Sequence, residues 1–517
     1  MSNPFPRHPH SCAPALRRPG PRAPRRAGTL AAALALAGCS SLLVTPDTDL
    51  SGVAVPATWS NAVATPSAPA LAAWWRRFDD PQLAALVTQA LQANTDVRTA
   101  QAALRQSRAQ RDVAAGGLLP SLGAGASAQR SKSGDNDAQT SYQAAFDASW
   151  EPDSFGGTAS GVAAADADTR AAASSLANVQ VSIAAETAVT YLELCALELR
   201  LAIARDNLAS QEETLQIADW RTQAGLTTSL DVEQARTSTE LTRSQLPALA
   251  ASIAATRSSL AILTGVTPEA LQSSLKIPAT VPVADDALAL AFPAETLRQR
   301  PDVRQAEDRV SAAASRVQQA DAARYPSFRL GGTLGVAALT LGGLTGGSSL
   351  VTALLGSVSV PIYSGGALTA QVRAQEAALE QARIAYEAVV LASLKEVEDA
   401  LVTVATSRER LATLRRAAEA ARNASLLARF RYNSGLSDFQ SVLQTQATVL
   451  SVEDGVANAQ ATLGVAHVRL YKALGGGWEP EAAGAAAPAV HGSAAPPDAT
   501  GDDGAAAAPV TSIKGRT

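Results

Sequence analysis

The sequence has few of the side chains from which disulfide frameworks, metal sites and most active sites are built. Its 517 residues include three cysteines, four histidines and one methionine, and aromatic residues make up 4%. Once residues 1–38 are set aside as a targeting segment, Cys12 is lost, Cys195 is the one thiol in the body of the chain, and His467 and His491 are the only histidines. We therefore expect no disulfide framework, and we predict no catalytic residues, no metal and no cofactor.

Long apolar runs and basic patches are also missing. Beyond the N-terminal region no run of about 18 apolar residues occurs, so we expect no helix that crosses a bilayer. The net charge is −4, and no basic cluster is interleaved with aromatics, which argues against a nucleic-acid partner. Much of the 47% hydrophobic content is alanine, which is typical of long helices packed closely on small side chains.

The N-terminus has the pattern of a secretory signal. Arginines cluster between residues 17 and 26, an apolar stretch follows over Thr29–Ala37, and the sequence "LAGC" ends at Cys39. "LAGC" resembles the lipobox of bacterial lipoproteins, in which the cysteine becomes the lipid-bearing first residue, so Cys39 is the predicted site of lipid (palmitate) attachment. The serines at 40 and 41, in place of aspartate, favour the outer membrane by the same resemblance. The alternative is an ordinary signal with a chance cysteine.

The chain contains the same plan twice. Asp96-Val97-Arg98 recurs as Asp302-Val303-Arg304, 206 positions later (302 − 96). Three further pairs follow in the same order: Pro120 and Pro326 at 206 (326 − 120), Phe155-Gly156-Gly157 and Ser364-Gly365-Gly366 at 209 (364 − 155), and Trp220 and Phe430 at 210 (430 − 220). Four ordered landmarks at a nearly constant offset indicate a tandem duplication.

Each half contains two Gly- and Ala-rich segments with alternating side chains. Over 121–129 and 141–150 the even positions are apolar and the odd ones are small or polar, and 327–336 and 350–360 repeat this less cleanly. Such alternation is typical of tilted membrane-spanning strands, with Tyr142 and Trp150 as interface anchors; the alternative is a pair of half-buried hairpins in a soluble protein. Four strands cannot close a barrel, so a membrane barrel needs several copies, and three give twelve strands.

Two long proline-free segments follow these hairpins, at 158–223 and 367–432. Apolar residues at spacings of three and four predict single helices of about 65 residues, close to 100 Å at 1.5 Å per residue. Helices of this length need neighbours along their length, as in a coiled coil or stalk, and their position after the hairpins favours a helical tube that continues a barrel. Gly225 and Gly435 follow the helices and are predicted to end them in the left-handed conformation.

Taken in order, these motifs make the chain resemble the TolC-type outer-membrane efflux channels, in particular their lipoprotein branch. The motifs are "LAGC", "WWRRFDDPQL" from Trp74, "RPDVRQAE" from Arg300 and "RYNSGLSDFQSVLQTQ" from Arg431, and the resemblance covers nearly all of 39–475. It implies a mainly α protein with a transmembrane β-barrel: a homotrimeric twelve-stranded barrel, four strands per chain, continued by a periplasmic α-barrel of twelve helices. It also implies an outer-membrane location, and as partners outer-membrane lipid, a periplasmic adaptor protein and an inner-membrane pump.

The resemblance further implies a gate at the periplasmic end, where the helical turns converge. Asp231, six residues after Gly225 (231 − 225), matches a family acid, and Tyr432 matches an aperture tyrosine. Ser441 and Gln444 stand where the family has acids, so Asp438 is a candidate to supply the charge instead. Alternatively, Asp231 is a helix N-terminal acid favoured by the dipole, and Tyr432 packs at the turn.

These features predict six segments. They are a lipoprotein signal (1–38), a lipid-anchored arm (39–80), a first efflux repeat (81–264), an inter-repeat belt (265–293), a second repeat (294–475) and a disordered Ala/Pro/Gly tail (476–517). The predicted function is a passive outer-membrane exit duct for drugs, solvents, metal ions or metabolites in a tripartite pump. Two alternatives stay open: a duct for type I protein secretion, and a non-conducting structural protein of the envelope.

Overall fold

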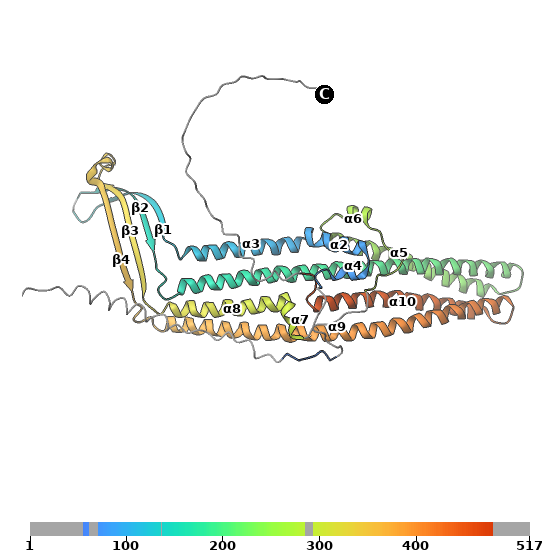
Figure 1. Cartoon of the computed structure of the whole chain (residues 1–517). Helices are drawn as coiled ribbons and strands as arrows, with labels where there is room; N and C mark the ends of the chain where they lie inside the picture. Colours follow the sequence, from blue (N-terminus) through green and yellow to red (C-terminus); the bar gives the residue numbers. More distant parts are fainter. Residues whose placement is uncertain (1–54, 61–70, 136, 285–292, 479–517) are drawn as a thin grey trace, which may run out of the picture. The chain divides into compact units, whose positions relative to one another are not determined.

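The computed structural model describes residues 55–60, 71–135, 137–284 and 293–478; the predicted signal, Cys39 and residues 479–517 lie outside them. Figure 1 labels the α-helices and the strands along the chain. In order they are the 3-10 helix η2 (Trp74–Phe78), α2 (Pro81–Ala93), α3 (Thr95–Gly116), β1 (Ser121–Ser131), β2 (Gln139–Trp150), α4 (Gly157–Gln223), α5 (Ser229–Thr264), α6 (Pro268–Ser274), α7 (Pro293–Gln299), α8 (Pro301–Ala322), β3 (Ser327–Ala338), the short 3-10 helices η3 (Leu341–Thr345) and η4 (Gly347–Ser349), β4 (Leu350–Ser359), α9 (Ala367–Asn433) and α10 (Phe439–Ala473).

The predicted long helices are confirmed. Helices α4 and α9 are each 67 residues long, and each leads through a short turn into a partner helix, α5 or α10. Within one chain α4 packs against α3, α5, α8 and α10, while α9 packs against α8 and α10. The neighbours that a helix of this length requires are thus present along much of α4.

The four strands form one antiparallel sheet in the order β1-β2-β3-β4 (Figure 1). The register pairs even-numbered residues with even-numbered ones in all three ladders, for example Leu122 with Ala148, Phe146 with Leu334, and Phe328 with Val358. The predicted alternation therefore continues across the sheet and collects apolar residues on one face. On the other face Thr333 donates a hydrogen bond to Asp147 (2.7 Å). β4 is the exception, because Val351 and Leu355 lie on this second face.

The structure corrects the alignment of the two halves. Both long helices start after a glycine with positive φ, Gly156 (72°) and Gly366 (83°), so these glycines correspond at an offset of 210 (366 − 156). Matching Phe155 to Ser364 by their following glycines is wrong by one residue. The strands β2 and β4 share the offset of 210, since Ser149 pairs with Ser121 as Ser359 pairs with Ser327. The change from 206 to 210 therefore lies entirely in the longer β3–β4 loop.

A break between stacked helices recurs in both halves and was not predicted. Asn94 ends α2, caps α3 through its side-chain oxygen (2.8 Å to Asp96 N) and donates from Nδ2 to Leu263 O (3.0 Å). Its counterpart 206 residues later is Arg300, which donates from Nη1 to Ala473 O (2.8 Å), the counterpart of Leu263 at 210. Both side chains are buried, so each break is held to the end of α5 or α10 by one polar contact.

The largest apolar core lies where α2, α4, α5 and α10 meet. Trp74 from the N-terminal arm stacks on Tyr471 of α10, with ring centroids 5.4 Å apart. Asp80 caps α2, accepting from Gln82 N (2.8 Å), and its second oxygen accepts from the Tyr191 hydroxyl (2.8 Å). The arm around residues 74–80 is therefore part of the folded body.

The inter-repeat belt is partly helical, because α6 forms within it, with proline in its first turn and Thr267 as its cap. The expectation of no helix that crosses a bilayer needs correction. α5 contains an 18-residue window with mean hydropathy 1.4, so by length and composition one described helix is apolar enough to cross a membrane. That hydropathy comes from alanine and leucine interspersed with serine, and Arg257 within α5 pairs with Glu198 of α4 (2.5 Å).

Candidate functional site

The candidate site is the pair of turns that join α4 to α5 and α9 to α10. Gly225 (φ 73°) and Gly435 (φ 69°) are left-handed, as predicted, and the residue after each donates to the carbonyl five residues back: Leu226 to Arg221 and Leu436 to Arg431, both at 2.8 Å. These bonds satisfy carbonyls that the helix end leaves unpaired. The two turns therefore have the same backbone geometry.

The next helix begins with opposite chemistry in the two turns. At α5, Thr228 is the cap, and its N–H and hydroxyl both donate to Asp231 Oδ2 (3.3 Å each). At α10 the acid itself is the cap: Asp438 Oδ1 accepts from Ser441 N (3.0 Å) and from the Ser441 hydroxyl. These hydrogen bonds lower the pKa of Asp438 below its usual value. The cap and the residue three positions later are therefore Thr228 and Asp231 in α5 but Asp438 and Ser441 in α10, so the acid and the hydroxyl residue are exchanged between the two turns.

Tyr432 lies in the apolar cluster that joins the two turns. It is 8% exposed and contacts Phe439 of α10, with ring centroids 5.2 Å apart. The guanidinium carbon of Arg221, at the end of α4, lies 4.5 Å from the Tyr432 ring centroid. Burial raises the pKa of the Tyr432 phenol, and among the described residues its hydroxyl has no hydrogen-bond partner. The ring packs at the turn while its polar end remains unsatisfied.

The structure brings some predicted gate residues together and separates others. Val232, the neighbour of Asp231, packs in the same apolar cluster as Tyr432, and Ser441 and Asp438 form one hydrogen-bonded pair. Gln444 lies on the exposed side of α10, in the turn after Ser441. Whether these residues line an aperture stays a prediction.

Sequence reasoning missed three contributors to this end of the molecule. Arg221 and Phe439 both contact the Tyr432 ring. Gln446, 4% exposed, donates to Thr214 of α4 (2.8 Å) and fixes α10 against α4. The aromatic–arginine pair Trp220-Arg221 recurs as Phe430-Arg431 in the second repeat, and this repetition could have marked Arg221 in advance. No local pattern in the sequence marks Gln446.

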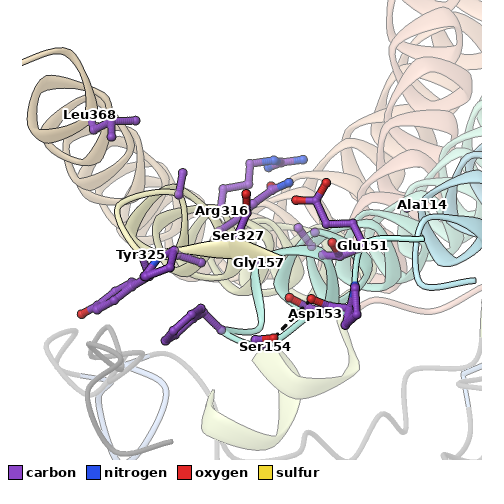
Figure 2. A pocket seen from close by; sticks show the side chains of 18 of the residues that line it. Ala114, Glu151, Asp153, Ser154, Gly157, Arg316, Tyr325, Ser327 and Leu368 are labelled. Carbon is purple, nitrogen blue, oxygen red and sulfur yellow. Dashed lines mark hydrogen bonds between the residues drawn. The ribbon is translucent and has the colours of Figure 1, made fainter. Parts of the chain in front are cut away.

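At the opposite end of α4 and α9, a cavity of about 640 Å³ lies between the start of α4, the end of α8 and the start of β3. Figure 2 shows Arg316, Glu151 and Gly157 around it, with Tyr325 at its edge. Phe155 stacks on Tyr325 with ring centroids 5.1 Å apart. This is where helices turn into strands, and each strand there follows a proline, Pro120 or Pro326.

Groups that could suggest other chemistry are accounted for by packing. Cys195 is buried, and burial raises the pKa of its thiol to about 12, so it is not a reactive thiolate. His467 is buried in α10, with Nδ1 2.9 Å from Leu463 O. Among the described residues no group of three or more His, Cys, Asp and Glu side chains could hold a metal ion.

Comparison with known proteins agrees with this architecture. The sequence profile of the family described as "Outer membrane efflux protein" matches residues 86–266 and 292–476. The pyoverdine export outer membrane protein OpmQ of Pseudomonas putida is 33% identical over 474 residues, covering 88% of this chain and 98% of the relative. Outer membrane protein OprJ of Pseudomonas aeruginosa is 29% identical over 457 residues, covering 86% and 95%.

Solved structures show the same fold. The outer-membrane channel OprN superimposes with a TM-score of 0.76 at 33% identity, covering 84% of this chain and all of that one. The open state of the Neisseria gonorrhoeae MtrE outer membrane channel superimposes with a TM-score of 0.74 at 27% identity, covering 84% of this chain and 99% of that one. The chain belongs to the outer membrane efflux protein family and is the outer-membrane channel component of a tripartite efflux pump, which works with an adaptor and an inner-membrane pump.

Proposed function

We propose that three copies of the chain close one twelve-stranded barrel in the outer membrane, continued into the periplasm by a barrel of twelve helices. The observation that carries this proposal is the four-stranded sheet, whose outer strands β1 and β4 have no further partner in the described chain. Open edges expose unpaired backbone groups, which hydrocarbon does not tolerate. Three sheets joined edge to edge remove every open edge.

The faces of the sheet support a membrane position. Leu122, Phe146, Leu334 and Leu354 lie on the even-numbered face and are 54% to 90% exposed in the single chain. Asp147, Thr333 and Ser149 lie on the opposite face. An apolar outer face and a polar lumen are what a barrel in lipid requires. The lipid anchor at Cys39 would hold each copy at the same membrane.

The duct is proposed to be gated at the turns of α4–α5 and α9–α10. One copy contributes Asp231, Tyr432, Asp438, Ser441 and Gln444, and three copies would place three of each around one axis. A ring of three aspartates attracts cations, whereas a ring of glutamines is neutral. With Ser441 and Gln444 in place of acids, Asp231 and Asp438 would supply the charge of this ring.

The proposed cargo is a class of small organic molecules. The relatives include proteins described as pyoverdine export and toluene efflux components. We propose that transport through the duct is passive and that its energy comes from the inner-membrane pump.

The decisive experiment is the mass of the detergent-purified mature protein, together with negative-stain images and conductance in planar bilayers. We expect a trimer, a tube longer than about 100 Å because α4 alone spans 67 residues, and discrete single-channel openings. A monomer, or a trimer that never conducts under any applied voltage, would contradict the proposal.

A further inference from the structure

The β3–β4 loop, residues 339–349, lies within a long stretch of the chain that carries no charge. Between Arg329 and Arg373 the sequence contains no Asp, Glu, Lys, Arg or His. The β1–β2 loop lies at the same end of the sheet (Figure 1) and contains Lys132, Asp135 and Asp137. The two repeats therefore carry equivalent loops of different chemistry, one charged and one uncharged.

The β3–β4 loop also exposes large apolar side chains. Leu339 and Leu341 are 63% and 67% exposed, and Leu344, which lies with Leu341 in η3, is half-buried. Loops that face water are normally polar, and exposed apolar patches mark surfaces that contact a partner or a membrane. The composition of this loop therefore indicates an environment other than bulk water.

Polar groups of the loop find hydrogen-bond partners within the loop itself. Thr340 Oγ1 accepts from Gly343 N (3.2 Å) at the start of η3. Ser349 is 5% exposed, and its hydroxyl lies within hydrogen-bond distance of Gly346 O (2.6 Å) and Leu344 O (2.9 Å). Polar groups that enter a region with little water must be paired internally. These bonds make the loop suited to such a region.

The loop folds over the apolar face of the sheet. η3 packs against β3 and β2, and a Cβ on Gly343 would lie 3.1 Å from Ala338 Cβ. Ala338 and its strand partner Tyr142 belong to the even-numbered, apolar face. Tyr142 is half-buried, whereas Ser141 and Gln143, on the opposite face of β2, are exposed. The apolar surface of the strands therefore continues onto the loop.

We propose that the β3–β4 loop lies in the outer leaflet of the outer membrane, with Leu341 among the lipid acyl chains and Tyr142 at the level of the headgroups. The inference rests on the proposed barrel and extends its lipid contact beyond the strands. The helices join the sheet at its opposite end (Figure 1), so helices in the periplasm place this loop at the outer side. Tyrosine is enriched where a protein passes from hydrocarbon to headgroups.

The other position open to an apolar loop is the mouth of the duct. A loop that closed the mouth would fold toward the face that carries Asp147 and Thr333, which the proposed barrel places in the lumen. η3 lies beside Ala338 instead, on the other face. The loop should therefore leave the mouth free, and Leu341→Ser should conduct like the wild type in planar bilayers.

Fluorescence quenching in proteoliposomes tests the position of the loop. Leu341→Cys in the full-length mature protein is labelled with a nitrobenzoxadiazole fluorophore, and the native Cys195 is buried. The protein is then reconstituted in phosphatidylcholine vesicles with and without nitroxide-labelled phosphatidylcholine. We expect the nitroxide lipid to quench the probe at 341 and aqueous iodide to leave it unquenched.

Two matched variants separate the loop from the barrel. Ser133→Cys labels the charged β1–β2 loop, where Ser133 is exposed, and should be quenched by iodide only. Phe146→Cys labels the apolar face of the strands, where Phe146 is 57% exposed, and should be quenched by the nitroxide lipid wherever the loop lies.

Two results would overturn the proposed position of the loop and leave the proposed barrel standing. One is lipid quenching at 146 together with iodide quenching at 341. The other is a higher conductance of Leu341→Ser, which would place the loop at the mouth. Equal lipid quenching at 133 and 341 would assign the signal to the fluorophore and also overturn the position. Iodide quenching at both 146 and 341 would overturn the loop position and the barrel together.

Discussion

Asp231 combines two roles at the residue scale that substitutions can separate. Asp231→Ala removes the acceptor of two hydrogen bonds from Thr228, which we expect to lower the free energy of unfolding by about 1 kcal/mol, and removes charge from the proposed gate. We expect higher single-channel conductance in planar bilayers. Asp231→Asn keeps an acceptor oxygen, so stability should hold while cation selectivity falls. If Asp231→Ala conducts like the wild type, Asp231 is not part of the gate.

At Tyr432, two substitutions distinguish the contribution of the aromatic ring to stability from that of the hydroxyl. Tyr432→Phe removes a buried hydroxyl that lacks a partner among the described residues, so we expect no loss of stability. Tyr432→Ala removes the contacts with Phe439 and Arg221 and should cost about 3 kcal/mol. Hydrogen exchange of the amides in the α9–α10 turn reports both effects. Equal protection in the two variants would show that the ring does not stabilise the turn.

Asp438 gives the turn a pH dependence of known sign. Its folded-state pKa is lowered by the Ser441 hydrogen bonds, so its capping contribution is complete above the ordinary carboxylate pKa of about 3.9 and is lost as pH falls through the lowered value. We expect exchange of the first-turn amides of α10 to accelerate below pH 4 in the wild type. Asp438→Asn should show no such step, and a step of the same size in this variant would assign it to another group.

At the scale of elements, two different residues bind the paired helix breaks to the end of the neighbouring helix, Asn94 at α5 and Arg300 at α10. Arg300, 6% exposed, joins the α7–α8 break to Ala473, Asp302 and Glu396, whereas Asn94 joins the α2–α3 break to Leu263 alone. Removing one partner of a buried charge cluster costs about 3 kcal/mol or more. Arg300→Ala should therefore loosen the end of α10 more than Asn94→Ala loosens the end of α5.

Hydrogen exchange at the two helix ends measures this comparison within one molecule. Arg300→Lys is the discriminating variant, because an ammonium cannot reproduce the forked contacts of a guanidinium. We expect it to recover only part of the protection at residues 470–473. Full recovery would mean that charge alone holds the break.

At the scale of the whole molecule, the proposed barrel predicts that the two faces of the sheet tolerate charge differently. Phe146→Arg places a charge on the exposed even-numbered face, which the proposal puts against lipid. An arginine facing lipid at the middle of the bilayer costs about 2–4 kcal/mol, so we expect less trimer in outer-membrane fractions.

Gln143→Arg supplies the matched control, because Gln143 lies on the opposite face of the same strand, which the proposal puts in the aqueous lumen. We expect this variant to assemble like the wild type. Equal losses of trimer in the two variants, measured by mass photometry of detergent extracts, would contradict the assignment of the faces.

The sequence by itself determined the elements and their order, because each depends on local periodicity. Alternation at 121–129 and 141–150 predicts the first hairpin, proline-free helical spacing predicts α4 and α9, and Gly225 and Gly435 mark where those helices end. The duplication determined that the two halves share one plan. The family resemblance rested on the same local motifs.

Only the tertiary structure decided the contacts between distant parts of the chain. The clamp of Arg300 on Ala473 and the contact of Arg221 with the Tyr432 ring join residues whose spacing in sequence carries no period. The offset of 210 at the start of the long helices likewise appeared only with the structure, because two adjacent glycines, Gly365 and Gly366, leave the sequence alignment there ambiguous by one residue. Local patterns determine elements, and packing determines which side chains meet.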